Sequence, residues 1–242
     1  MATFVLVHGA FGGAWCWYRV VAELERRRHR VLAPDLPGHG RNAAPTSSVT
    51  YARYVESVLD LVSAEAEPVI LVGHSMGGAV ITGVGEAAPE KIAALVYLTA
   101  VIGPSGTTML EAAPPPAQGA AAPGIDFTPD GAIQMKKEGL AAYGYADCSA
   151  EDVALARLCK TPQALEPMTA PIVWTPERCG RISRNYIGCS QDRVNGSIEH
   201  QMARASMMPG TTFVTLDSSH SPFFSMPVTL VDTLETMIPG QP

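Results

Sequence analysis

Residues 69–78 have the sequence VILVGHSMGG, an apolar run that ends in the pattern Gly-x-Ser-x-Gly around Ser75. The run before the serine is typical of a buried strand, and the residues after it have the spacing of a helix rich in glycine and alanine. A serine between the two occupies a sharp turn, where side chains at Gly73 and Gly77 would clash. The turn pushes the hydroxyl out of the sheet and points a helix N-terminus at developing negative charge. We therefore predict that Ser75 is a nucleophile; the alternative is a glycine-rich turn with an incidental serine.

The sequence on either side of this turn alternates short apolar runs with segments of helical length. This alternation predicts an α/β fold, with a mostly parallel sheet flanked by helices. The expected strands are residues 4–7, 31–33, 69–72, 95–99, 185–189 and 212–216. The expected helices are residues 15–28, 51–64, 76–87 and 228–237.

The alternation stops between residues 103 and 181, where prolines and alanines are frequent, notably at 114–116 and 120–124. Helical patches are expected at 130–142 and 150–159. We interpret residues 103–181 as a cap inserted into an α/β core of residues 1–102 and 182–242. A disordered linker is the alternative, but regularly placed Leu, Met, Tyr and Trp residues argue against it.

A serine hydroxyl needs a base to remove its proton, and histidine is the usual one. On a sheet of this kind the nucleophile, the acid and the histidine follow one another along the chain. Only His200 and His220 follow a plausible acid. His200 lies in a polar helical stretch, whereas His220 follows the last strand, at the same sheet edge as Ser75. We predict that His220 is the base; an ordinary surface-loop histidine is the alternative.

The acid that orients this histidine is predicted to be Asp192, just past the strand at 185–189. Asp217 is nearer to His220 in the sequence, but it ends the strand that leads to the histidine and could point elsewhere. Residues 102–106, a third place for the acid, contain no carboxylate.

Two backbone N–H groups are expected to stabilise the oxyanion: that of Met76, and that of Ala10 in the loop HGAFGG at residues 8–13. The glycines of this loop allow the backbone to approach a substrate. The loop lacks the Lys-Ser/Thr of a phosphate-binding P-loop.

The composition excludes several other classes of protein. The 242 residues suit one domain with an insertion, and 47 % hydrophobic with 17 % charged residues suit a folded core. The net charge of −6 argues against nucleic-acid binding, and the basic run at 26–30 is interpreted as a solvated helix end. No segment has the roughly 18 apolar residues that would span a membrane. The five scattered cysteines suggest neither disulfides nor a metal site. We expect a cytoplasmic protein without metal or other cofactor; a homodimer is left open.

These motifs resemble a known family along nearly the whole chain. Residues 4–11 (FVLVHGAF), 15–18 (WCWY), 175–178 (TPER) and the segment from 186 to Asp192 resemble plant methyl-ester esterases and hydroxynitrile lyases. The tail SHSPFFSMP at 219–227 is most similar to bacterial pyrethroid-hydrolysing carboxylesterases. The match is weakest in the cap. The resemblance implies an α/β-hydrolase fold and a serine esterase.

Two positions argue against the lyase branch, which has a threonine and a lysine where this chain has Gly9 and Ser221. We therefore expect a carboxylesterase with a small hydrophobic ester as substrate, either pyrethroid-like or a methyl or aryl ester. The alternatives are carbon–carbon or lactone cleavage, hydroxynitrile lysis and, from another class, a ligand-sensing receptor. The residues expected around the substrate are Phe11, His74, Tyr143, Trp174 and Phe223.

Overall fold

Six parallel strands form the central sheet of the computed structural model, which describes residues 1–112, 124–136 and 139–240. Adjacent strands pair in parallel throughout this sheet. The predicted α/β fold is therefore confirmed, and each of these strands overlaps its predicted range. In spatial order they are β2 (Arg30–Leu32), β1 (Thr3–Val7), β3 (Val69–His74), β4 (Ile92–Leu98), β7 (Ser183–Cys189) and β8 (Thr211–Leu216).

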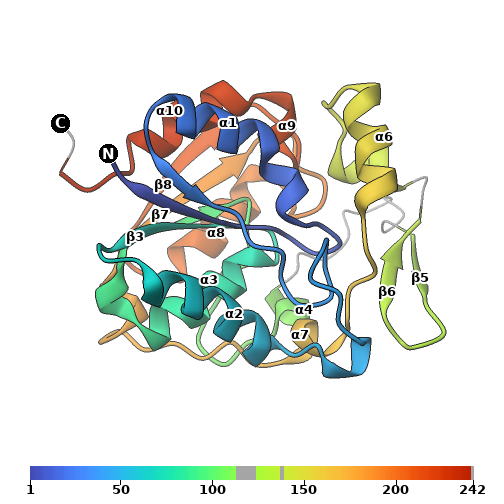
Figure 1. Ribbon diagram of the computed structural model, residues 1–242, viewed down its shortest axis with the longest axis horizontal. Coiled ribbons are helices and arrows are strands. Elements are labelled where there is room, and N and C mark those ends of the chain that lie inside the picture. Colours follow the sequence, from blue (N-terminus) through green and yellow to red (C-terminus); the bar gives the residue numbers. More distant parts are fainter. Residues whose placement is uncertain (113–123, 137–138, 241–242) are drawn as a thin grey trace.

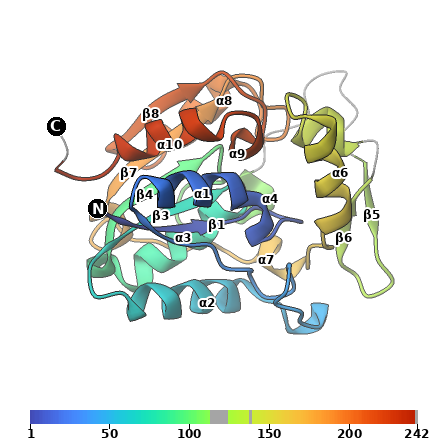
Figure 2. The ribbon, with the colours of Figure 1, turned by 45° about the horizontal axis from the view of Figure 1, so that its top comes forward.

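Helices cover both faces of the sheet (Figures 1 and 2). One layer contains α1 (Tyr18–Arg26) and α10 (Pro227–Glu235). The opposite layer contains α2 (Tyr51–Ala64), α3 (Gly77–Ala87) and α8 (Ile198–Ser206). Short elements complete the core: η1 (Ala14–Trp17), η2 (Thr46–Ser48), η3 (Pro89–Lys91), η5 (Cys179–Arg181) and α9 (Pro222–Ser225).

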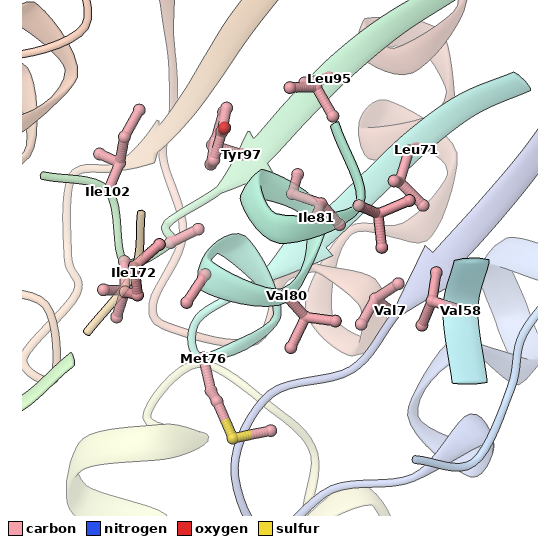
Figure 3. Close-up of a cluster of buried hydrophobic side chains, with 14 of the residues drawn as sticks. Val7, Val58, Leu71, Met76, Val80, Ile81, Leu95, Tyr97, Ile102 and Ile172 are labelled. Carbon is pink, nitrogen blue, oxygen red and sulfur yellow. The ribbon is translucent and has the colours of Figure 1, made fainter. Parts of the chain in front are cut away.

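Alternate residues of β1 face the two layers, as the two-residue period of a strand requires. Phe4 and Leu6 pack with the layer of α1 and α10, while Val5 and Val7 pack with that of α2 and α3. Figure 3 shows Val7 beside Val58 of α2 in the second layer. Because these four side chains of β1 are fully buried, each stabilises the fold by roughly 1.5–3 kcal/mol. The sheet is thus a rigid support for the loops at its edge.

The chain between β4 and β7 forms additional elements, several of which stand to one side of the sheet (Figure 1). The predicted cap contains these elements, while its prolines at 114–116 and alanines at 120–122 lie outside the described residues. The division of the chain into core and cap stays a prediction. The elements are α4 (Met109–Ala112), β5 (Ile125–Phe127), β6 (Ile133–Met135), a π-helical turn η4 (Leu140–Gly144), α6 (Ala150–Cys159) and α7 (Glu166–Thr169).

The predicted helix at 130–142 is wrong in its first half. Ile133–Met135 is strand β6, which pairs antiparallel with β5. Gly131 has a φ of 80°, and the Ala132 amide donates a hydrogen bond to the Thr128 hydroxyl, so a tight turn takes the place of helix. Residues 137–138 lie outside the described residues, and the described backbone is helical from Gly139 into the π-helical turn at Leu140–Gly144. The helix predicted at 150–159 is confirmed as α6, which begins with a capping box from Ser149.

The basic run at residues 26–30 is largely neutralised by carboxylates. Arg27 pairs with Glu23, Asp232 and Glu235, and Arg30 pairs with Glu65. This segment is therefore a charged helix end that leads into β2, as predicted. In the described part of the chain, every helix is too short or too polar to cross a membrane.

Replacement of Gly77 by alanine is expected to destabilise the fold. A Cβ atom there would lie 2.6 Å from the Val7 carbonyl oxygen and 2.9 Å from that of His8, and backbone cannot move aside cheaply. We expect a loss of about 1–3 kcal/mol in the free energy of unfolding, measured by urea denaturation. Gly144→Ala is the control, because no atom lies within 4 Å of the added carbon. Equal stability of the two variants would contradict the close packing of α3 on β1.

Candidate active site

The predicted site residues lie in loops that follow the carboxyl ends of the sheet strands. Residues 8–13 follow β1, Ser75 follows β3, Thr99 follows β4, Asp192 follows β7 and His220 follows β8. Because the strands are parallel, these ends meet at one edge of the sheet. Residues far apart in the sequence are thereby brought together.

Ser75 occupies a strained turn between β3 and α3. Its φ is 52°, in the left-handed region that non-glycine residues rarely adopt. Hydrogen bonds on both sides hold it there. The Ser75 amide donates to Leu98 O at 3.2 Å, while its carbonyl oxygen accepts from the amides of Gly78 at 3.0 Å and Val101 at 2.9 Å. The turn is therefore fixed by β4 and by the loop that follows it.

Glycines allow the chain to pack closely around this serine. A Cβ atom on Gly73 would lie 2.5 Å from Gly77 O, and one on Gly9 would lie 2.9 Å from Ser75 Cβ. Only hydrogen at these positions permits the observed contacts. The loop after β1 therefore lies directly against Ser75, where its backbone can reach a group bound to the serine.

Asp192 and His220 form a buried pair at the same edge. His220 Nδ1 lies 2.8 Å from Asp192 Oδ2, and Thr99 Oγ1 donates a short hydrogen bond to the same oxygen. The other oxygen, Oδ1, accepts from the amides of Val194 at 2.6 Å and Asn195 at 3.1 Å. Burial alone would raise the pKa of Asp192, but the charge of His220 and these hydrogen bonds lower it below its usual range. The carboxylate is thus held ionised and oriented toward the histidine.

Ser75 and His220 both line a cavity of about 180 Å³. Because Asp192 occupies Nδ1, Nε2 is the ring nitrogen left to accept the serine proton. Among the described residues, Ser75 Oγ makes no hydrogen bond to this ring. Such bonds are often long in the absence of substrate and shorten when it binds.

The other histidines have different partners. His74 Nε2 donates to the carbonyl oxygen of His220 at 2.9 Å, and burial holds its pKa well below the usual range. A neutral His74 therefore supports the loop that carries His220. His8 begins the loop after β1, its Nε2 accepts from the Leu36 amide at 3.1 Å, and burial lowers its pKa to about 3. The remaining three histidines form side-chain hydrogen bonds elsewhere: His29 with Glu235, His39 with Gln163 and His200 with Ser197.

Asp217, the alternative acid, has its own partners at the surface. Its carboxylate accepts hydrogen bonds from Ser190 Oγ at 2.8 Å and from Gln191 Nε2 at 2.9 Å. Asp192, and not Asp217, therefore contacts His220.

Ala10 and Met76, the predicted oxyanion donors, both line the cavity beside Ser75. In the described part of the chain, neither amide takes part in the hydrogen bonds that hold the adjoining loops and turns. Two N–H groups are thus available next to the serine, as an oxyanion hole requires.

Three of the five residues expected around a substrate line this cavity, namely Phe11, His74 and Phe223. Tyr143 and Trp174 are not part of its wall. Trp174 packs on the core, and its Nε1 donates to Gly103 O at 3.0 Å. Its ring therefore holds the start of the segment between β4 and β7. Tyr143 lies in η4, and the residues that follow it, Gly144 and Tyr145, form the wall instead.

Two contacts of this site were missed in the sequence. One is Thr99, a polar residue at the end of the buried run of β4, a position that could have indicated it. The other is Asp147, whose carboxylate accepts from Ser218 Oγ and from the Ser219 amide, both at 2.9 Å. Burial would raise the pKa of Asp147, but these hydrogen bonds lower it. Asp147 lies in the segment between β4 and β7, 72 positions before Ser219. No local sequence signal could therefore link it to the loop of His220.

Comparisons with known proteins agree with this geometry. The chain is 33 % identical over 242 residues to putative methylesterase 14 of Arabidopsis thaliana, covering 94 % of this chain and 69 % of that protein. It is 31 % identical to methyl jasmonate esterase 1 of Vitis vinifera, covering 97 % and 96 %. The crystal structure of a pyrethroid hydrolase from Sphingobium faniae JZ-2 superposes with a TM-score of 0.86 at 30 % identity, covering 99 % and 98 %. Residues 4–233 match the model of the alpha/beta hydrolase family. The chain belongs to the alpha/beta hydrolase family.

Proposed function

We propose that this protein hydrolyses a small, largely apolar carboxylic ester through an acyl-enzyme on Ser75. The observation that carries the proposal is the buried Asp192–His220 pair, which faces the same cavity as the strained serine. Relatives named methylesterase, methyl jasmonate esterase and pyrethroid hydrolase support ester hydrolysis over the alternative reactions. The protein is a carboxylic ester hydrolase, and the roles of its individual residues are part of what we propose.

In the first half of the reaction, Ser75 Oγ attacks the ester carbonyl carbon while His220 Nε2 takes the serine proton. The negative charge that forms on the carbonyl oxygen is stabilised by the amides of Ala10 and Met76. Each donor of this kind contributes roughly 2.7–4 kcal/mol to the transition state. The alcohol then leaves with the proton from His220. Asp192 stabilises the charged imidazole between these steps.

In the second half, water takes the place of the alcohol. His220 removes a proton from the water, which attacks the acyl carbon, and the acid is released as Ser75 regains its proton. Apart from water, these steps need only groups that the chain itself supplies.

The lining of the cavity supports an apolar substrate body. The apolar side chains of Met109, Leu110, Met135, Met168 and Phe223 all line the cavity of Ser75. Such a surface binds hydrocarbon rather than sugar or phosphate.

Hydroxynitrile lysis is disfavoured by two contacts. A side chain at Gly9 would collide with Ser75, so no hydroxyl can replace the glycine without movement. Ser221 Oγ, at the position of the lyase lysine, donates to Gly144 O at 2.6 Å and carries no positive charge. Neither the substrate hydroxyl nor departing cyanide therefore has the partner that the lyases use.

The other expectations from the sequence stay predictions. These are activity without metal or cofactor, a cytoplasmic location and the open question of a homodimer.

Asp192→Asn is expected to reduce kcat/KM for a p-nitrophenyl ester on the order of 10⁴-fold, because the amide favours the wrong tautomer of His220. The matched control is Asp217→Asn, since Asp217 bonds only surface groups. We expect this variant to keep nearly full activity. Equal or reversed effects of the two substitutions would show that Asp192 is not the acid.

A comparison of two substrates tests the reaction itself. The wild type should release p-nitrophenol from p-nitrophenyl butyrate, and should release benzaldehyde from mandelonitrile no faster than buffer does. Ser75→Ala, checked for native circular dichroism, should hydrolyse no ester. Benzaldehyde release that depends on Ser75 would favour the lyase reaction. Absence of ester turnover in the wild type would favour a ligand sensor.

A further inference from the structure

A second, larger cavity adjoins the one that contains Ser75. Its volume is about 550 Å³, and it lies between the hairpin of β5 and β6 and the end of α6. Phe11, Met135 and Lys160 line both cavities, so these three residues form the boundary between them. A substrate that is attacked at Ser75 therefore shares its cavity with the side chain of Lys160.

The side chain of Lys160 places a positive charge at this boundary between the two cavities. Its ammonium nitrogen lies 5.2 Å from the centre of the Phe11 ring and 5.4 Å from that of Tyr145, within the range of cation–π contacts. The backbone directly after Lys160 is anchored, because the Thr161 amide donates to Phe11 O at 3.1 Å. Among the residues that the structure describes, no carboxylate lies within ion-pair distance of this ammonium. Among the described residues, the negative potential beside the Lys160 ammonium therefore comes from the faces of these two aromatic rings.

Four titratable groups near the ammonium are uncharged at neutral pH. Burial raises the pKa of the Cys16 thiol to about 12 and raises that of Tyr145 well above its usual range. Burial lowers the pKa values of His39 and His74, which both sense the charge of Lys160. Burial also lowers the pKa of Lys160 itself to about 8, so most of it remains protonated at pH 7.

The described residues that line the larger cavity have an excess of positive charge as well. Lys136 and Asp126 neutralise one another at 3.3 Å. Arg157 also lines this cavity, and no ion pair to it is found in the described part of the chain. An anion that entered from this side would meet two cations, Lys160 and Arg157, to which the described residues offer no carboxylate partner.

We infer that Lys160 binds a carboxylate of the substrate, and that the preferred substrates are half-esters of dicarboxylic acids. In such a molecule the esterified end reaches Ser75, the apolar chain lies among the methionines, and the free carboxylate meets the ammonium. A charge-assisted hydrogen bond to the substrate then supplies the acidic partner that the described residues do not offer to Lys160. This inference rests on the proposed ester hydrolysis and deepens it by naming the substrate class.

The test compares monomethyl and dimethyl esters of succinic, glutaric and adipic acid, which differ within each pair mainly in charge. We expect the wild type to favour the monoester of at least one chain length by about tenfold or more in kcat/KM. Lys160→Met should lose this preference while it still hydrolyses the dimethyl ester. Lys160→Arg should retain the preference. Lys136→Met is the matched control, because Lys136 is already paired with Asp126, and it should change the ratio little.

The pH dependence separates recognition by charge from a structural role. The ratio of the two kcat/KM values cancels any titration of His220, which both substrates use. In the wild type this ratio should be constant between about pH 6 and 7, where the substrate carboxylate is ionised and Lys160 is mostly protonated. It should fall as the pH rises through about 8, because the free ammonium then loses its proton. In Lys160→Arg it should stay constant to higher pH. A merely structural lysine would leave the ratio unchanged.

Three results would overturn the inference. If dimethyl esters are hydrolysed and the wild type favours no monoester more than Lys160→Met does, the carboxylate site is wrong and the esterase stands. If none of these esters is hydrolysed but p-nitrophenyl butyrate is, the carboxylate site is wrong and the esterase stands. If p-nitrophenyl butyrate is not hydrolysed either, both the site and the proposed function are wrong.

Discussion

The left-handed backbone of Ser75 is the constraint on which the rest of the site depends. Such a conformation costs a non-glycine residue about 1–3 kcal/mol, and it persists only because surrounding structure holds it. Here the support comes from Leu98 O, from the amide of Val101 and from the close approach of Gly9. The same turn exposes the hydroxyl and frees the Met76 amide beside it. Strain, nucleophile and oxyanion donor therefore arise from one local geometry that the buried parallel sheet keeps rigid.

His220, the proposed base, is positioned by a second set of contacts, which the segment between β4 and β7 helps to form. His220 is held from one side by Asp192 and from another by His74, whose ring donates to its carbonyl oxygen. Asp147, which lies in that segment, binds the adjoining Ser219. The position of the histidine consequently depends on this segment as well as on the sheet. A substitution there that changes the substrate can thereby also shift the proposed base.

Local patterns predicted those features that depend on neighbouring residues. The strand–turn–helix around Ser75 could be recognised because its glycines and its apolar run are contiguous, and parallel strands place Asp192 and His220 at the same edge. Contacts between distant segments could not be predicted. The strand at Ile133–Met135 exists because Ile125–Phe127 pairs with it, and the apolar spacing alone indicated a helix. The same holds for Trp174, which donates a hydrogen bond to Gly103 O and does not line the cavity. Nothing near Trp174 in the sequence specifies that partner.

The central claim is that Ser75 alone is activated for attack on a carbonyl-like centre. Labelling with a fluorophosphonate and mass spectrometry of the peptides tests this most directly, because the probe reacts with a serine only when a base and an oxyanion hole are in place. The account predicts a single label per chain, on the peptide that contains Ser75, and no label on Ser75→Ala. A label on another residue, or undiminished labelling of Ser75→Ala, would contradict it.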